Sequence, residues 1–369
     1  MKIAMASAYF ALMSGGGEYY TLYLSRELRK LGHEIEIICG KGIFGGHTPL
    51  SDEFPLHLVP QVFALRQLAM KYPKLSPLLW RVHEQQYAHS CRKYMADRYD
   101  VVHVHDPGSL IAVASAAPMG ASVATLHGRP AARLRKYLKR LGGIIAVSED
   151  VASVLRGMSF DPVVITPGVD FEVFHPMDAD KCRRELGLDG PVILFVGRLN
   201  RLKGLEYLIA AMKKVNECFR NASLIIVGDG PLEKLCRELS SAHGIADSVV
   251  FKGRVSHKDL PKFYAAADVL VLPSFYESFS MVVLEAMACG CPVVTTRNVQ
   301  AVMAMGNEES KVISAGDSDA IASSVSAILA DESLAADMRR KSFEFVKNFD
   351  WMTRAVQFEQ IYNEVTSRK

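Results

Sequence analysis

The sequence has no apolar run that approaches the roughly 20 residues of a membrane-spanning helix. Its start, Met1–Ser7, is typical of a first strand rather than of a signal peptide. A disulfide framework is also missing, because most of the seven cysteines fall inside apolar helix or strand patterns. Those predicted to be buried thiols are Cys39, Cys91, Cys218 and Cys236. Cys289 and Cys291 are too closely spaced, with too few neighbouring ligands, for a zinc site. We therefore expect a cytoplasmic protein with free thiols.

The chain of 369 residues is too long for one ordinary core, and its length favours two domains. Hydrophobic residues make up 49% and charged residues 22%, as in ordinary globular proteins. The net charge of +3 is uneven, since residues 1–170 hold 19 Lys and Arg against 14 Asp and Glu. This small excess favours an anionic partner for the first half of the chain, and we expect no nucleic-acid partner.

Strand and helix patterns alternate along almost the whole chain, which is typical of parallel sheets covered by helices. The predicted strands are Lys2–Ala6, Glu34–Cys39, Val101–His105, Ser122–Leu126, Gly143–Val147, Val163–Thr166, Val192–Val196, Ser223–Val227, Val249–Lys252, Val269–Leu272, Pro292–Thr295 and Lys311–Ser314. The fold class is therefore α/β, with two doubly wound, Rossmann-like domains. We place the first domain at 1–166, a proline-containing linker at 167–176 and the second domain at 177–349, followed by a final helix at about 350–369.

The stretch Val269–Val294 of the second domain combines a strand, Val269–Leu272, with a loop that contains Glu277 and an apolar helix that contains Glu285. Eight residues separate the two glutamates, a little over two helical turns, so both can face one pocket. Glu285 lies in a run too apolar for a solvent-facing side and needs partners there. The N–H groups of the first turn, at Phe279, Ser280 and Met281, favour an anion. The alternative is a capped, solvated helix with two unrelated glutamates.

This stretch resembles the Glu-x7-Glu motif of the retaining family 4 (group 1) glycosyltransferases, which have the two-domain GT-B fold with an interdomain cleft. The resemblance covers nearly the whole chain. It implies that Glu277 hydrogen-bonds the donor sugar, that Glu285 binds the ribose hydroxyls of the nucleotide, and that the final helix crosses back onto the first domain. Ser280 is a departure, because the family usually has glycine at this position.

A second loop, Gly197–Gly204, follows a predicted strand and contains Arg198 and Lys203. Two cations on a glycine-containing backbone suit a diphosphate. The loop is similar to the family's Gly-Arg-x5-Lys-Gly pattern, which implies that Arg198 and Lys203 bind the donor diphosphate. Val227–Pro231 matches a family turn, and the segment around Arg254 matches a wall of the base pocket, although Arg254 could equally face solvent.

In the first domain, Gly15, Gly16 and Gly17 lie between the first strand and a helix, where the backbone can approach a phosphate or an acceptor. The family has a Gly-Gly loop here that contacts donor and acceptor. His127 stands at a strand end, and Arg129 follows it as a further acceptor-binding candidate. The resemblance implies that His127 lies next to the reacting sugar. We place His103 and His105 on opposite faces of the preceding strand, which would exclude a metal pair.

The resemblance implies a retaining transfer of a hexose-type sugar from a nucleoside diphosphate to a hydroxyl acceptor. We assign catalytic roles to His127, Glu277, Arg198 and Lys203, the cations taking the place of a metal at the leaving diphosphate. We expect no cofactor and no metal. Two alternatives are a nucleotide-sugar epimerase of the same architecture and a non-catalytic protein that binds a glycan or a lipid.

Residues 129–140 carry six cations and no acid, and a helical reading places their leucines on one side. We expect a basic amphipathic helix here. A second candidate, Leu65–Arg81, mixes cations with Leu, Met, Tyr and Trp. Both patterns favour contact with an anionic membrane at the cytoplasmic face and a lipid or anionic acceptor. An ordinary surface helix that packs its leucines on the sheet would show the same pattern.

Overall fold

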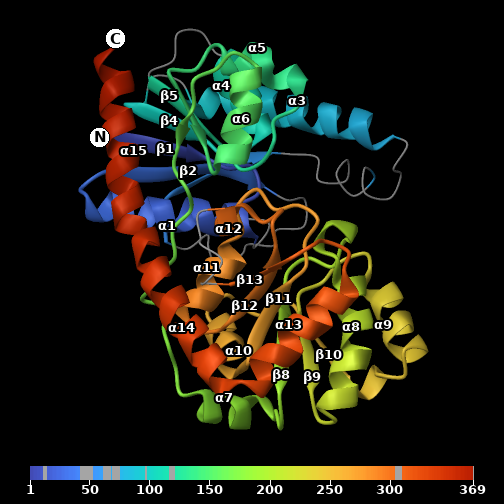
Figure 1. The fold of residues 1–369 in the computed structure, drawn as a ribbon. Helices are drawn as coiled ribbons and strands as arrows, with labels where there is room; N and C mark the ends of the chain where they lie inside the picture. The colour runs from blue at the N-terminus through green and yellow to red at the C-terminus, as the bar shows by residue number, and fades with distance from the viewer. Residues whose placement is uncertain are drawn as a thin grey trace. The chain divides into compact units, whose positions relative to one another are not determined.

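The protein was analysed as a computed structural model, which describes residues 1–10, 15–41, 53–60, 68, 75–95, 98–115, 121–303 and 310–368. The chain forms two compact units of similar size (Figure 1). The first comprises Met1–Pro167 together with Trp351–Lys369, and the second comprises Gly168–Asp350. The predicted linker, 167–176, begins at the boundary between the units and otherwise belongs to the second.

The first unit is built on a parallel sheet with the strand order β3-β2-β1-β4-β5-β6-β7. Its strands are β1 Lys2–Ala6, β2 Glu34–Lys41, β3 Leu56–Pro60, β4 Val101–Val104, β5 Ala121–Leu126, β6 Gly143–Ala146 and β7 Val163–Val164. The strand order reverses between β1 and β4, and doubly wound sheets bind ligands at the carboxyl ends of such a pair. Strand β3, whose five residues end in Pro60, was not predicted; a proline is tolerated here because β3 is an edge strand.

The helices of the first unit include the C-terminal one, α15, which Figure 1 shows in red beside α1. They are α1 Gly16–Lys30, α3 Ser76–Met95, α4 Pro107–Ser115, α5 Arg135–Leu138, α6 Glu149–Gly157 and α15 Trp351–Ser367. The ring of Trp351 meets that of Tyr20 edge-on at 4.9 Å, and His33 on the loop after α1 bonds Glu359 at 2.9 Å. Aromatic burial and these polar contacts attach α15 to α1.

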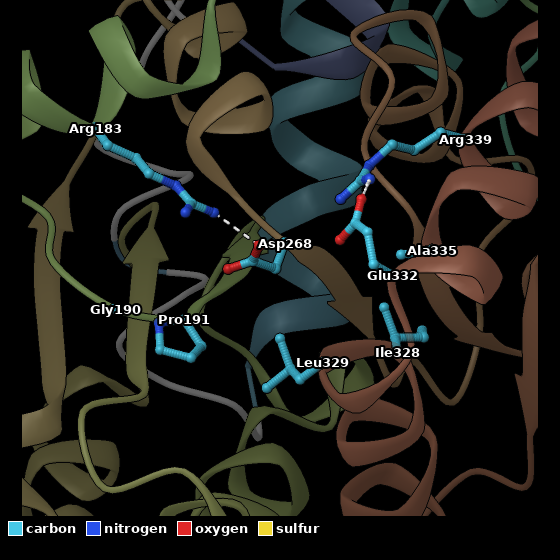
Figure 2. A pocket seen from close by; sticks show the side chains of 9 residues that line it. All are labelled: Arg183, Gly190, Pro191, Asp268, Ile328, Leu329, Glu332, Ala335 and Arg339. Carbon is cyan, nitrogen blue, oxygen red and sulfur yellow. Dashed lines mark hydrogen bonds and ion pairs between the residues drawn. The ribbon is translucent and has the colours of Figure 1, made fainter.

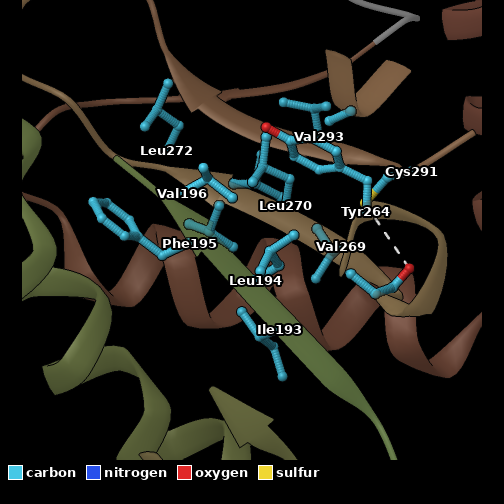
Figure 3. Packing of buried hydrophobic residues seen from close by; sticks show 14 of the residues in the cluster. Ile193, Leu194, Phe195, Val196, Tyr264, Val269, Leu270, Leu272, Cys291 and Val293 are labelled. Carbon is cyan, nitrogen blue, oxygen red and sulfur yellow. Dashed lines mark hydrogen bonds between the residues drawn. The ribbon is translucent and has the colours of Figure 1, made fainter. Parts of the chain in front are cut away.

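The second unit contains a parallel sheet with the order β10-β9-β8-β11-β12-β13. Its strands are β8 Val192–Val196, β9 Ser223–Val227, β10 Val249–Gly253, β11 Val269–Leu272, β12 Val293–Thr296 and β13 Lys311–Ile313. Strands β8 and β11 are buried along their whole length, as expected for a sheet covered on both faces. Figure 3 shows their side chains packed with Tyr264 and Cys291 in the core. The predicted α/β fold class with two doubly wound sheets is confirmed.

The helices of the second unit are α7 Ala179–Leu186, α8 Leu205–Cys218, α9 Glu233–Ala242, α10 Leu260–Ala266, α11 Met281–Ala288, α12 Gln300–Met303, α13 Ser318–Ala330 and α14 Glu332–Val346. Among the described residues, no helix combines the length and hydropathy that a bilayer crossing would require. All seven cysteines are free thiols, but Cys218 is exposed at the end of α8, so its predicted burial was wrong.

The basic amphipathic helix expected over residues 129–141 is also wrong. A 3-10 turn, Ala132–Leu134, leads into α5, which has only four residues. Leu134 and Leu138 are buried, so the leucines pack inward as in an ordinary surface segment. Arg133 forms two hydrogen bonds with Glu84 of α3, at 2.7 and 2.9 Å, which neutralises one cation of the stretch. Most of the second candidate segment, 65–81, lies outside the described residues.

Candidate active site

Three loops of the second unit meet at the carboxyl edge of its sheet because glycines allow their backbones to touch. They follow β8, β9 and β11. A Cβ atom on Gly228 would collide with the carbonyl oxygen of Gly197, and one on Gly204 would collide with that of Pro273. Both positions also have positive φ, +132° at Gly228 and +63° at Gly204, which glycine adopts without strain. The sequence-predicted turn at 227–231 therefore joins the β8 and β9 loops.

Lys203 and Glu277 form an ion pair within this cluster of loops. Lys203 ends a 3-10 turn that Asn200 caps, its side chain accepting the N–H of Leu202 at 3.0 Å. Ser274 donates its hydroxyl hydrogen to the same Glu277 oxygen, at 3.2 Å. The Lys203 and Glu277 side chains are 18% and 16% exposed, so both remain accessible to a ligand. Two predicted site residues 74 positions apart are thus brought together where the strand order reverses between β8 and β11.

The two predicted arginines of this unit lie on exposed loops at the same edge. Arg198 is exposed directly after β8. Arg254, after β10, donates to Asp229 at 2.8 Å in a pair whose side chains are 62% and 48% exposed. An ion pair this exposed is weak and easily exchanged for a ligand. Arg254 faces solvent in this state.

Ser280 adopts an unusual backbone conformation immediately before α11. Its φ is +92° and its ψ is +94°, a combination that side chains with a Cβ atom rarely adopt. Ser159 is the other non-glycine residue with positive φ in the described part of the chain. The conformation explains physically why glycine suits this position, and it places strain at the entrance of the helix. Phe279, just before it, is buried, whereas Met281 is half-buried.

Glu285 is buried one turn into α11 and has two partners. His257 lies 3.0 Å from one carboxylate oxygen, and Tyr264 donates its hydroxyl to the other at 2.8 Å. Burial, and next the charge of Glu285, raise the pKa of Tyr264 well above its usual value, so the tyrosine stays a donor. These two hydrogen bonds confirm the expectation that a carboxylate in this apolar run needs hydrogen-bond partners. They differ from those of Glu277, so the two glutamates belong to separate hydrogen-bond networks, and their shared pocket stays a prediction.

In the first unit the glycine loop ends in the first turn of α1. Gly15 is the residue before the helix, while Gly16 and Gly17 are already helical. No described atom lies within 4 Å of a Cβ built on Gly16 or Gly17, so the backbone there is open. Glu18 reaches back over Gly15, which brings a negative charge to the end of the helix that favours anions.

His127 follows β5 and contacts His105, which follows the neighbouring strand β4. Its Nε2 lies 3.2 Å from Nδ1 of His105, and the ring of Tyr20 packs edge-on against it at 4.7 Å. Burial lowers the pKa of His127 to about 4, so the imidazole is neutral at pH 7. The rings of His103 and His105 lie 4.1 Å apart, and their placement on opposite faces was wrong. Residues two apart on a strand share a face, a signal already present in the sequence.

Arg129, a predicted acceptor-binding residue, forms a fork of hydrogen bonds with Asp150 at the start of α6. Its Nε donates to one carboxylate oxygen at 2.9 Å, and an Nη atom donates to the other. The Arg129 side chain is 56% exposed, so an acceptor could still contact its outer face. Its role as an acceptor ligand stays a prediction.

The second unit also contains a cavity of about 260 Å³ at the opposite, amino-terminal edge of its sheet (Figure 2). Arg183 bonds Asp268 at 2.7 Å, and Arg339 bonds Glu332 at 2.6 Å, so its charges are paired. Asp268 directly precedes β11 and lies at the opposite end of that strand from the loop of Glu277.

Asp178 and Asp180, at the start of α7, are spaced as an Asp-x-Asp pair. Asp178 caps this helix, because its side chain accepts the N–H of Lys181 at 2.9 Å.

Two family models match the chain, one for each half. The model described as glycosyl transferases group 1 matches residues 178–345, and the model described as glycosyltransferase family 4 matches residues 14–173. Together they include every candidate site residue described above and all strands of the two sheets except β1.

Full-length relatives have related names. A D-inositol 3-phosphate glycosyltransferase 2 of Catenulispora acidiphila is 31% identical, covering 95% of this chain and 90% of its own. An uncharacterized glycosyltransferase of Methanocaldococcus jannaschii is 32% identical over 80% of each chain. A phosphatidyl-myo-inositol mannosyltransferase of Mycobacterium leprae is 29% identical, covering 100% of this chain and 98% of its own.

Solved structures share the fold. A sucrose-phosphate synthase of Thermosynechococcus elongatus superposes with a TM-score of 0.81 at 23% identity, covering 100% of both chains. The Anabaena protein HepE, solved with UDP and glucose, gives a TM-score of 0.78 at 19% identity over 98% of both chains. Its sequence relatives, its matched family models and its two doubly wound sheets show that the chain belongs to the family 4 (group 1) glycosyltransferases of the GT-B fold.

Proposed function

We propose that the protein is a retaining glycosyltransferase that moves a hexose-type sugar from a nucleoside diphosphate to a hydroxyl acceptor. The observation that supports this most is the Lys203–Glu277 pair among the glycine loops that follow β8, β9 and β11. A cation and a sugar-binding carboxylate held at one strand-end edge suit the two halves of a nucleotide sugar. HepE, a fold neighbour, has been solved with UDP and with UDP-glucose.

In the proposed reaction, the bond between the sugar's anomeric carbon and the diphosphate oxygen breaks, and a bond to the acceptor oxygen forms on the same face. The acceptor proton passes to the departing phosphate. Lys203 and Arg198 stabilise the negative charge that grows on the diphosphate, together with the N–H groups at the start of α11. Glu277 accepts hydrogen bonds from sugar hydroxyls while Lys203 and Ser274 hold its carboxylate in place. Because Lys203 and Arg198 stabilise the charge of the leaving diphosphate as a metal ion would, we expect the reaction to require no metal.

Glu285 is the proposed ribose ligand, and its buried network suits that role. His257 and Tyr264 each occupy one position on its carboxylate, which offers about four lone-pair sites. Sites therefore remain for two ribose hydroxyls. Because ribose contacts are similar in the ground and transition states, Glu285 contributes to donor affinity more than to turnover.

For the acceptor we propose a phosphate-bearing alcohol, either soluble or in a membrane surface. The names of two relatives include an inositol phosphate and a phosphatidylinositol. Leu75, directly before α3, and Leu78 and Val82, in its first two turns, are 53%, 59% and 46% exposed and recur at helical spacing. Arg81 is exposed beside them. An apolar stripe with a cation suits shallow insertion between anionic lipid headgroups.

Two measurements test the proposal. A thermal-shift screen of nucleotide sugars identifies the donor, and the anomeric configuration of the transferred sugar, determined by NMR, must equal that of the donor. Donor turnover to an isomer without any acceptor would instead indicate an epimerase, and binding without turnover would indicate a non-catalytic protein.

Sedimentation with anionic and neutral vesicles at low and high salt tests the membrane contact. Leu78→Ser should weaken it, and absence of anionic-vesicle binding at low salt would favour a soluble acceptor.

A further inference from the structure

The contact between His105 and His127 determines which nitrogen of His127 bears a proton. The rings follow the adjacent parallel strands β4 and β5, and the two nitrogens are 3.2 Å apart, within hydrogen-bond distance. Burial lowers the pKa of both imidazoles, that of His127 to about 4 and that of His105 well below its usual value. Each neutral ring carries one N–H, so one ring donates and the other accepts.

The two possible arrangements differ in what they leave on the far side of His105. Its Nε2 is buried and has no hydrogen-bond partner within the described residues. If His127 donated, His105 would carry its hydrogen on Nε2, leaving a buried N–H unsatisfied. If His105 donates from Nδ1, Nε2 is only a bare acceptor. Orphaned buried N–H groups are rarer in proteins than buried acceptors that lack a partner, which favours the arrangement in which His105 donates.

The arrangement in which His105 donates from Nδ1 also determines which hydrogen-bonding group His127 presents to a ligand. With Nε2 accepting from His105, the hydrogen of His127 must be on Nδ1. The His127 ring is half-buried, and Nδ1 has no partner in the part of the chain that the structure describes. Because the ring is only half-buried, a donor on Nδ1 is available to a ligand.

We propose that His105 is a positioning residue that fixes His127 as a neutral Nδ1–H donor. His127 then donates a hydrogen bond to an oxygen of the bound ligand, and it does not act as the base that takes the acceptor proton. The assignment of that oxygen to the donor sugar rests on the proposed function; the tautomer does not. His103 cannot substitute for His105, because Tyr362 and Thr125 already occupy its two ring nitrogens, each at 2.7 Å.

Nitrogen NMR of protein labelled with ¹⁵N-histidine tests the tautomer directly. Long-range ¹H–¹⁵N correlations at pH 7.5 should show His127 protonated on Nδ1, the minor form of free imidazole, with its signals identified by their loss in His127→Gln. In His105→Leu, His127 should change to the Nε2–H form. His103→Gln is the matched control, which disturbs the neighbouring buried histidine and should leave the tautomer unchanged. An Nε2–H form of His127 in the parent protein would overturn the proposal.

Kinetics with the identified donor test the consequence. His105→Asn keeps a side-chain N–H close to the position of Nδ1 and should retain kcat/KM within about threefold of the parent, whereas His105→Leu should lose about tenfold, the effect of one hydrogen bond. Equal losses in both variants, with the Nδ1–H form retained in both, would contradict a positioning role. A parent protein that turns over no donor would contradict the proposed function alone, since the NMR result stands without it.

Discussion

Acidification should destabilise the first unit because it buries neutral histidines. Burial lowers the pKa of His103 to about 3, that of His127 to about 4, and that of His105 well below its usual value. In the unfolded chain each titrates near 6.5. Below that pH the three histidines bind protons in the unfolded chain but stay neutral in the folded unit. Their contribution to the free energy of unfolding is therefore complete above about pH 7 and is lost as pH falls toward 4.

The size of the effect follows from the unfolded pKa. At pH 5.0 the pH lies about 1.5 units below that unfolded value, which is worth about 2 kcal/mol each for His103 and His127, or about 4 kcal/mol together relative to pH 7.5, and His105 adds to the loss in the same direction. Because the folded pKa values of His103 and His127, about 3 and about 4, lie below pH 5.0, their share of the loss depends little on the exact size of the shifts. Buried Asp106, whose pKa burial raises, acts in the opposite direction and offsets part of the loss. A domain is stable by only about 5–15 kcal/mol, so the effect is large.

Urea unfolding followed by tryptophan fluorescence measures this loss, since both tryptophans, Trp80 and Trp351, belong to the first unit. The parent should lose several kcal/mol of unfolding free energy between pH 7.5 and 5.0. In His127→Gln the loss should shrink by about 2 kcal/mol, one histidine's share. His89 is exposed on α3, and His89→Gln is the matched control that should keep the parent's loss. The same pH dependence in His127→Gln and the parent would refute the reasoning.

Ser280→Gly should raise the free energy of unfolding by about 1 kcal/mol, because it relieves the positive φ, while Ser280→Ala should not; equal unfolding midpoints for all three proteins would show that the position is unstrained. Lys203→Ala should lower kcat by about 10²-fold or more, with the fold checked by circular dichroism, and near-parental turnover in a folded variant would remove Lys203 from the diphosphate site. Glu285→Gln should raise the donor dissociation constant with a smaller change in kcat, measured by calorimetry and steady-state kinetics, and Tyr264→Phe should reproduce part of that effect. Unchanged donor affinity in both would leave their network a purely structural role. Chelation with EDTA should leave turnover unchanged, and loss of turnover that magnesium restores would show that the cations do not replace a metal.

The sequence predicted the sheets well because strands buried on both faces have a local signature. Val192–Val196 and Val269–Leu272 are continuous apolar runs, and both are strands at the expected residues. The loops after them were recognisable for the same reason, since a glycine or proline ends each run. The ion pair of Lys203 with Glu277 was not predicted, although parallel strands end at one edge of the sheet and so bring the loops of these two residues together.

Edge and surface segments were harder to predict. Leu56–Pro60 has mixed polarity because an edge strand is only half covered, and the pattern did not indicate a strand. The stretch 129–141 has the period of an amphipathic helix, yet α5 spans only Arg135–Leu138. Periodicity records which side chains are buried and does not report whether the backbone hydrogen bonds of a helix extend along the whole stretch.

The sequence by itself determined the family, the two doubly wound sheets and the identity of the candidate site residues, because local periodicity and loop chemistry are properties of neighbouring residues. Only the tertiary structure decided their partners: His257 and Tyr264 for Glu285, and His105 for His127. Partners 21 to 28 residues apart are joined by strand register and helix packing, which no short sequence window contains.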